Sequence, residues 1–255
     1  MYPTNNQSIA TIQVSIPQGT LIPVSVEWDG EYSISLVCAA AIEPAIHSAI
    51  QYIWQRLRES AIQGLLDIIP AYHTITILLD PEKWNNRTQA TSLSAGLVPL
   101  LIQRLQTHAK VVSLVTRKIS IPVCYHIRMA PDLEALASWA DCTPEEVIAI
   151  HTNTVYSVYM LGFLPGFAYM GKVDARIAAP RHQRPRKEVP PGSVGIAAQQ
   201  TGIYPTASPG GWQLIGRTPL RMWMPEHSNP CFLQPGDEVR FYPISLNEYD
   251  QLATT

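Results

Sequence analysis

The residues best suited to chemistry lie between His151 and Leu220. This stretch holds nine of the chain's 14 glycines, and six of its 18 Lys/Arg side chains lie between Lys172 and Lys187. Glycine lets the backbone approach a ligand or another strand closely, and arginine offers forked donors that match a carboxylate or a phosphate. Together with neighbouring Tyr and Trp side chains, this composition predicts a small-molecule site on a β scaffold.

The basic loop 181–187 has the sequence RHQRPRK. A charge run of this kind is often only a solvated surface segment. Here, however, prolines restrict the loop and the glycine-rich segment Gly192–Ala198 follows at once. A preordered arginine pair suits a carboxylate or phosphate ligand. Both readings stay open, and Arg181 and Arg186 are the expected contacts if an anion binds.

The segment Gly166–Val173, GFAYMGKV, is close to a phosphate-binding loop of the form G-x-x-x-x-G-K-[ST]. Val173 offers no hydroxyl to a magnesium ion, and Pro180 follows too soon for a convincing helix. Bulky Phe167, Tyr169 and Met170 also suit a packed turn better than a phosphate cradle. We therefore reject a nucleotide loop here.

His151 is expected at the C-terminal end of a helix that begins near Pro144. Two interpretations remain open from the sequence. The side chain is either a surface or capping histidine near the negative end of the helix dipole, or a proton carrier near the basic loop. No hydrolase triad or dinucleotide motif can be assembled around it.

Composition narrows the class of protein. The four cysteines show no C-x-x-C pair and no zinc spacing, so we expect reduced thiols and no metal site. The net charge of −2 argues against nucleic acid as a partner. The first basic residue is Arg56, and the longest apolar run, Ile34–Ile42, is interrupted by Ser35 and is too short for a bilayer. A soluble, cytoplasmic protein is expected.

The N-terminal half alternates strand and helix patterns. Residues 1 to about 20 are polar and aperiodic, which predicts a loose tail. The order strand, helix, strand, strand, helix, strand then predicts a ferredoxin-like α+β domain over residues 21–125. Its expected elements are Ser33–Val37, a helix from Pro44, Leu65–Ile69, Thr74–Leu79, a helix over Leu97–Ala109, and Ser120–Tyr125.

From Ala130 onward the pattern changes. A short helix is expected after Pro131, and Thr143 with Glu146 predicts a capping box that starts another. Beyond it, short β-like runs are broken by Gly and Pro down to a final strand at Glu238–Ile244. This pattern is typical of a β-barrel or sandwich, here covering residues 126–255.

Several long phrases resemble a known family. LGFLPGFAYMG, PR…PR…VPPGSVGIA, QTGIYPTASPGGWQLIGRTPL and PGDEVRFYPI are similar to the family of allophanate hydrolase subunit 1, the 5-oxoprolinase B subunit and the kinase inhibitor KipI. The resemblance covers nearly everything after about residue 30. Pro191 stands where the family usually has a small residue, which should stiffen that turn.

The resemblance implies a ferredoxin-like N-terminal domain and a cyclophilin-like β-barrel. It implies a partner, a subunit-2 or subunit-C (KipA-like) protein, and a third oxoprolinase subunit. The complex would open 5-oxoproline to glutamate with ATP, whose site lies with the partner subunits. Alternatives are the carboxyltransferase half of a urea carboxylase-like system and a binding module that inhibits a sensor histidine kinase.

The resemblance also implies site residues. Arg186 and Arg217 would act as anion clamps, and His151 as an acid/base with them. Gln200 and Tyr204 would donate or accept hydrogen bonds in the cleft. The positions expected to bind substrate are Tyr169, Arg181, Gln200, Thr201, Tyr204, Pro205, Gly210 and Trp212.

Overall fold

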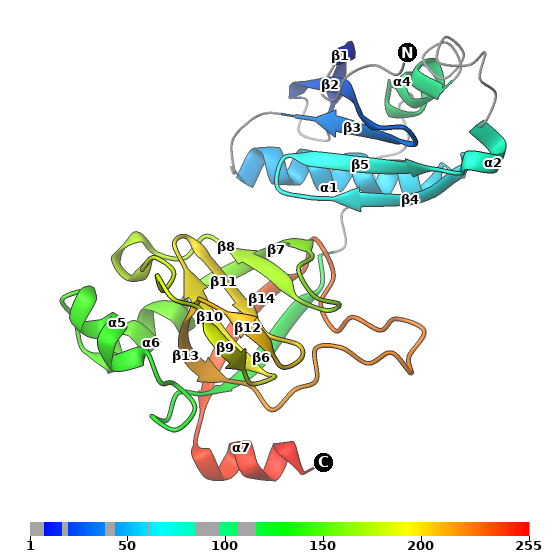
Figure 1. Cartoon of the computed structure of the whole chain (residues 1–255). Helices are drawn as coiled ribbons and strands as arrows, with labels where there is room; N and C mark the ends of the chain where they lie inside the picture. Colours follow the sequence, from blue (N-terminus) through cyan, green and yellow to red (C-terminus); the bar gives the residue numbers. More distant parts are fainter. Residues whose placement is uncertain are drawn as a thin grey trace. The chain divides into compact units, whose positions relative to one another are not determined.

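The structure is a computed structural model that describes residues 8–16, 20–38, 44–60, 62–84, 97–106 and 116–254. The chain divides into two compact units, Met1–Val115 and Thr116–Thr255, each with its own core (Figure 1). The division lies before the expected boundary at 125/126. Within the described ranges, no helix is both long enough and apolar enough to cross a membrane.

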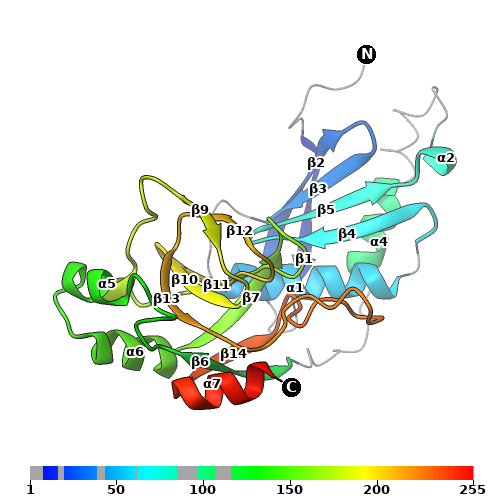
Figure 2. The same ribbon diagram turned by 60° about the horizontal axis from the view of Figure 1, so that its bottom comes forward.

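The first unit is a five-stranded antiparallel sheet with the order β1-β2-β3-β5-β4. Its strands are β1 (Ser8–Ser15), β2 (Leu21–Gly30), β3 (Ser33–Val37), β4 (Leu65–Pro70) and β5 (Thr74–Leu79). The helices α1 (Pro44–Glu59) and α4 (Val98–Gln106) contact each other and the sheet, and the short α2 (Pro81–Trp84) follows β5. Figure 2 shows α1 running along one side of the sheet.

The helical periodicity around Pro44 predicted α1 correctly. Ile50, Ile53 and Leu57 are fully or almost fully buried against the sheet. The second expected helix is present as α4, and residues 107–109 of that prediction lie outside the described residues. The paired strands expected after Gly64 are also confirmed, as β4 and β5.

Two predictions for this unit were wrong. Residues 8–15 are not a loose tail, because Ile12 and Val14 alternate with polar residues and pack their buried side chains into the core. The segment Ser120–Tyr125 is not the last strand of this sheet. The place beside β3 belongs to β2, which forms a hairpin with it. The elements β3, α1 and β4 follow one another with β5 between the two strands in the sheet, and the ferredoxin-like assignment of the whole domain stays a prediction.

The second unit contains a closed barrel with the strand order β10-β11-β8-β7-β14-β6-β13, and β13 pairs with β10 to close it. The expectation of a barrel is thus confirmed. Its strands are β6 (Lys118–Cys124), β7 (Val155–Leu161), β8 (Ala168–Gly171), β10 (Ser193–Ala197), β11 (Gln200–Ile203), β13 (Gln213–Arg217) and β14 (Glu238–Ile244).

Strand β6 belongs to the barrel because it pairs in parallel with β14 along its whole length, from Lys118 to Cys124. An ion pair fixes the start of this pairing. Arg117 Nε donates to Asp237 Oδ1 at 2.7 Å, and Arg117 Nη2 donates to the second carboxylate oxygen. The local sequence of β6 predicts a strand, but not which sheet it joins.

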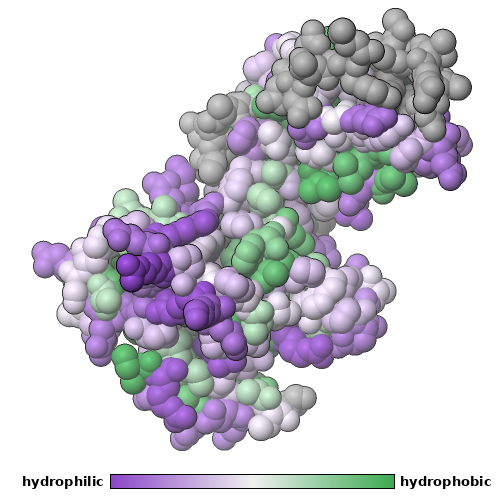
Figure 3. All heavy atoms as spheres, in the orientation of Figure 1, coloured by the Kyte–Doolittle hydropathy of each residue, from purple (hydrophilic) through white to green (hydrophobic). Residues whose placement is uncertain are grey.

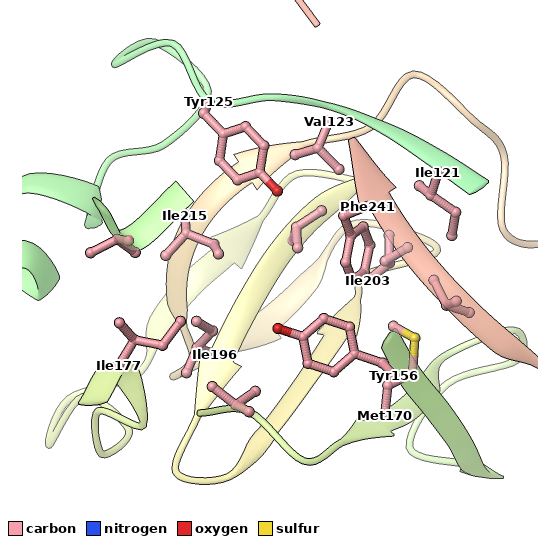
Figure 4. Close-up of a cluster of buried hydrophobic side chains, with 14 of the residues drawn as sticks. Ile121, Val123, Tyr125, Tyr156, Met170, Ile177, Ile196, Ile203, Ile215 and Phe241 are labelled. Carbon is pink, nitrogen blue, oxygen red and sulfur yellow. The ribbon is translucent and has the colours of Figure 1, made fainter. Parts of the chain in front are cut away.

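Apolar side chains fill the barrel. Figure 4 shows them pointing inward from strands on opposite sides. The labelled members that are fully or almost fully buried include Ile121, Val123, Tyr156, Ile196, Ile203, Ile215 and Phe241. The alternation along each strand sends every second residue into this core and its neighbours to the outer face.

Further elements lie outside the barrel strands. They are α5 (Leu133–Trp139), α6 (Pro144–Asn153), the 3₁₀ turn Ala175–Ile177, α7 (Leu246–Ala253), and a two-stranded sheet of β9 (Arg186–Val189) and β12 (Ser208–Gly210). The capping box that begins α6 is confirmed, with Thr143 Oγ1 accepting from Glu146 N at 3.2 Å. Helix α7 was not predicted, although Ser245 and Glu248 form the same motif at its start.

Candidate functional site

On the outer face of the barrel, two paired glycines leave a place without side chains. Gly195 in β10 lies directly opposite Gly202 in β11. A Cβ atom on Gly202 would lie 3.0 Å from the Phe167 ring, and one on Gly195 would lie 3.0 Å from the Trp212 Cβ. We call this pair the glycine platform. It lets two large side chains lie close against the sheet.

An aromatic cluster rests on the platform, formed by Phe167, Tyr169, Tyr204 and Trp212. The centroid of the Phe167 ring is 4.9 Å from Tyr169, 5.3 Å from Tyr204 and 5.4 Å from Trp212. All three contacts are edge-to-face, the arrangement favoured by the ring quadrupoles. Val189, Ala197 and Leu214 complete this small core, which is separate from the barrel interior.

The Tyr204 ring also packs against the backbone at Gly210. A Cβ atom on Gly210 would lie 2.4 Å from the Tyr204 hydroxyl oxygen, so the ring occupies the space that a side chain would need. Burial raises the pKa of the Tyr204 hydroxyl, while a hydrogen bond to the Trp212 backbone and the nearby Arg181 charge act in the opposite direction. The hydroxyl is therefore protonated at neutral pH.

The basic loop lies beside this cluster. The Arg181 guanidinium lies 5.6 Å from the centroid of the Trp212 ring, a cation–π distance. Arg186 Nη2 donates to Asp132 Oδ1 at 2.6 Å, and Arg186 Nη1 is buried without a hydrogen-bond partner in the described part of the chain. His182 Nε2 lies 3.2 Å from Asp132 Oδ2, without hydrogen-bond alignment. The loop thus presents a fixed guanidinium next to aromatic rings.

His151 lies elsewhere, in the barrel core, and has no exposed surface. Its ring stacks on Phe241 at 4.5 Å between centroids. The Thr201 hydroxyl donates to Gly195 O at 3.0 Å, so it accepts from His151 Nε2 at 3.2 Å, and His151 Nδ1 accepts from the Tyr125 hydroxyl at 2.9 Å. Burial lowers the pKa of His151 to about 3. The side chain is a neutral core histidine.

Both interpretations of His151 from the sequence differ from this position. It is neither at the surface nor beside the basic loop, because α6 turns its last residues toward the barrel interior rather than toward solvent. Thr201 faces the same interior. These two residues therefore do not share a surface with the aromatic cluster, and the structure gives both a place in the core.

Among the described residues, no hydrogen bond or ion pair joins Arg217 to Arg186. Its Nε donates to Pro191 O at 2.7 Å, and its charge lies near Tyr249 of α7. The turn that includes Pro191 therefore holds this side chain at the end of β13. The expected pair of clamps is not assembled by any described interaction.

The other expected positions lie closer to the cluster. Gln200 lies on the same outer side of β11 as Gly202, because both are an even number of residues from Tyr204. Pro205 is buried directly after Tyr204. The sequence missed Asp132, whose contact with Arg186 joins residues 54 apart in the chain. Its only sequence signal was an acidic residue at a helix start.

The aromatic cluster reaches the surface through Phe163. This side chain is 59% exposed, and its ring meets the Phe167 ring edge-on at 5.4 Å. Its φ of 70° lies in the left-handed region, which bulky residues rarely adopt. Figure 3 shows that the visible face of the barrel unit carries apolar surface bordered by hydrophilic side chains.

Comparison with known sequences gives consistent matches. The family model described as "Carboxyltransferase domain, subdomain C and D" matches residues 24–233. The chain is 44% identical to the 5-oxoprolinase B subunit of Bacillus subtilis (strain 168) over 206 residues, which is 80% of this chain and 84% of that protein. It is 37% identical to the 5-oxoprolinase B subunit of Escherichia coli O157:H7 over 215 residues, covering 84% and 93%.

Several solved structures also superpose on this chain. The protein TTHA0988 superposes with a TM-score of 0.68 at 32% identity, and the match covers 84% of this chain but only 40% of that longer chain. The conserved protein PH0987 from Pyrococcus horikoshii gives 0.51 at 35% identity, covering 88% and 99%. The K. lactis urea amidolyase gives 0.68 at 20% identity, covering 96% and 16%, which shows a shared fold.

Proposed function

The chain belongs to the family described as the carboxyltransferase domain, subdomain C and D, and from this premise we propose that it serves as the B subunit of a 5-oxoprolinase complex. The observation that carries the proposal is the 44% identity to a protein of that name, over 84% of that protein's length. The reaction is the ATP-dependent opening of the cyclic amide of 5-oxoproline to give glutamate.

We place the substrate-facing surface of this subunit at the basic loop and the aromatic cluster. The carboxylate of 5-oxoproline needs a cationic donor, and Arg186 is held in place by Asp132 with its charge near the Tyr204 hydroxyl. The partly exposed Tyr169 side chain offers a further polar group, whereas the Tyr204 hydroxyl is buried and hydrogen-bonded to the Trp212 backbone, so it supports this surface from beneath. Arg181 adds a second positive charge above Trp212. Arg217 is not included, because its described hydrogen bond is to Pro191 O.

A subunit with this surface needs other subunits for the chemistry. Its relatives are named as B subunits, which implies a complex with at least one further kind of chain. We propose that a subunit-C (KipA-like) protein and a third subunit complete the active site and hold ATP. The segment Gly166–Val173 forms the end of a packed turn and strand β8 here, so it supplies no nucleotide loop.

Reconstitution tests this proposal. The chain is combined with its two partner subunits, and 5-oxoproline-dependent ATP hydrolysis and glutamate formation are measured. Arg186→Ala should lower kcat/KM roughly 10²-fold while partner binding is retained, because a preorganised charge contact is lost. Arg184→Ala, in the same loop but with an exposed side chain, is the matched control and should keep full activity.

Two results would contradict the proposal. One is full 5-oxoprolinase activity from this chain alone. The other is no activity in any combination of subunits whose assembly has been verified by size-exclusion chromatography.

A carboxyltransferase role is the second candidate. It is favoured by the family description and by 32% identity to the urea amidolyase of Lachancea kluyveri over 132 residues, which cover 47% of this chain and 7% of that protein. In this case the reconstituted complex should transfer a carboxyl group from carboxybiotin. ATP hydrolysis that depends on 5-oxoproline and proceeds without biotin would exclude this alternative.

A further inference from the structure

Asp132 is used in an unexpected way. It is the N-cap residue of α5, where an Asp side chain normally accepts a hydrogen bond from the first turn of the helix. Here its side chain makes no such bond. The carboxylate turns away from the helix that it precedes, and the side chain is only 7% exposed. A buried carboxylate needs strong partners to compensate for its lost hydration.

Those partners come from two segments distant in the chain. Oδ1 accepts from Arg186 Nη2 at 2.6 Å, and Oδ2 accepts from the backbone N–H of Leu214 at 2.6 Å. The Asp132 backbone N–H donates in return to Leu214 O at 3.0 Å. The carboxylate is therefore fixed to β13, one of the rigid barrel strands, and from there it holds the basic loop.

This arrangement fixes the direction of the Arg186 guanidinium. An unrestrained arginine samples many rotamers, and ordering it costs conformational entropy at the moment of binding. Asp132 takes up one described N–H contact of the guanidinium, and Nη1 remains without a partner in the described chain. Arg186 is also tied through its backbone, because it lies opposite Gly210 in the β9–β12 pair. The Arg186 charge also acts on the Tyr204 hydroxyl, so these two groups lie near each other.

The same carboxylate balances charge. Arg186 and His182 both approach it, His182 Nε2 at 3.2 Å from Oδ2, while Arg181 lies over Trp212. Without Asp132, the cationic groups of the basic loop would repel one another and move apart into solvent. With it, these groups can stay close together.

We propose that Asp132 is a positioning residue, which aligns Arg186 for the anionic group of the substrate. The identity of the substrate, 5-oxoproline, rests on the proposed function. The alignment of Arg186 by Asp132 does not depend on it. Asp132 itself does not touch the substrate.

The variant Asp132→Asn tests this role in the reconstituted complex. It keeps the shape of the side chain and an oxygen for Leu214 N, but loses the charge that holds Arg186. We expect the KM for 5-oxoproline to rise about tenfold with a smaller change in kcat, and Asp132→Glu to recover little because its longer chain displaces the carboxylate. Asp174→Asn, which removes the carboxylate of an exposed pair with Arg176, is the matched control and should leave KM unchanged.

A double-mutant cycle separates positioning from general damage. In the Arg186→Ala background, Asp132→Asn should change kcat/KM by less than twofold, because no guanidinium remains to be aligned. Multiplication of the two single effects would overturn the proposal. So would an unchanged KM in the Asp132→Asn complex.

A measurement without substrate keeps this inference distinct from the proposed function. In ¹⁵N-labelled protein, the Arg186 guanidinium N–H resonances should be protected from solvent exchange, and Asp132→Asn should abolish that protection while the backbone amide spectrum is retained. Unchanged protection would overturn the proposal. If the wild-type complex lacks 5-oxoprolinase activity, only the proposed function fails, and the loss of this protection still supports Asp132 as the residue that aligns Arg186.

Discussion

His151 is a histidine whose two ring nitrogens are both used inside the barrel. Its Nδ1 accepts a hydrogen bond from Tyr125 and its Nε2 donates one to Thr201. The Thr201 hydroxyl in turn donates to Gly195 O. Protonation would place a second proton on Nδ1, where the Tyr125 hydroxyl now donates, and a charge in an apolar core. Both effects disfavour the imidazolium, and burial is the cause that lowers the pKa of His151 to about 3.

This pKa gives a prediction for stability. Above the ordinary histidine pKa of 6.5, neither the folded nor the unfolded chain protonates His151, so its full contribution is present. Between 6.5 and about 3 the unfolded chain takes up a proton and the folded chain does not, so stability falls by up to about 1.4 kcal/mol per pH unit. Urea unfolding of the wild type and His151→Gln between pH 7 and pH 4 measures the difference.

The variant should show a flatter decline of stability with falling pH than the wild type, whatever its stability at pH 7. His126→Gln, at an exposed position, is the control and should follow the wild-type curve. Parallel curves for the wild type and His151→Gln would show that His151 does not resist protonation in the folded chain.

Among the elements, β10, β11 and β12 depend on glycine for different reasons. Gly195 and Gly202 leave space above a paired stretch of strand, whereas Gly210 in β12 leaves space for the Tyr204 hydroxyl. From the sequence, we expected glycines in this region to break short β-like runs. Their places in the structure show that three of them instead accommodate the rings of the aromatic cluster, so the glycine content of this stretch is a packing requirement of the candidate site.

The adjacent pair Gly210 and Gly211 makes this requirement measurable. Gly210→Ala should destabilise the protein by about 1–3 kcal/mol, since its Cβ atom would lie 2.4 Å from the Tyr204 hydroxyl oxygen and force the ring to move. Gly211→Ala should stay within about 0.5 kcal/mol, because its Cβ atom would meet only ordinary contacts, the nearest at 3.6 Å. Denaturant unfolding gives both values, and near-ultraviolet circular dichroism reports the displaced tyrosine. Equal effects of the two substitutions would contradict this account of Gly210.

Sequence patterns predicted the helices that are specified by residues within the helix itself. The spacing of Ile46, Ile50, Ile53 and Leu57 was sufficient for α1, and Thr143 with Glu146 for the start of α6. The sheet that a strand joins was not accessible in this way. β6 has an ordinary strand sequence, and its place follows from pairing with β14, about 120 residues away.

In the candidate site, too, residues with a local sequence signal could be predicted and residues placed by distant contacts could not. Arg181 and Arg186 could be found because prolines and glycines surround them, and Trp212, Tyr204 and Gly210 because the family resemblance implies them. His151 was misplaced, since a helix end says nothing about which side of the helix a core covers. Asp132 was missed because an acidic residue before a helix already has a common local explanation.

At the scale of the whole molecule, the chain contains two units with separate apolar cores. The barrel unit includes β6, whose Ile121 and Val123 are fully buried in it. A fragment of residues 116–255 should therefore fold by itself, with a cooperative thermal transition. A fragment of residues 126–255, cut at the boundary expected from the sequence, should not, because it lacks a barrel strand and leaves β13 and β14 unpaired on one side.

Circular dichroism melting of the two fragments, expressed in parallel, decides between these boundaries. A cooperative transition in both would show that β6 is dispensable for closing the barrel.

The parallel pairing of β6 with β14 also sets the order in which this protein can fold as it is synthesised. The β1–β5 sheet can form once residues up to Leu79 have left the ribosome, because all of its strands lie in that span. β6 is made soon afterwards, but its partner strand and Asp237 are translated about 120 residues later. Until then the barrel stays open, with the backbone groups and apolar side chains of β6 exposed. The nascent chain should therefore depend on chaperones late in translation, after the first unit is already folded.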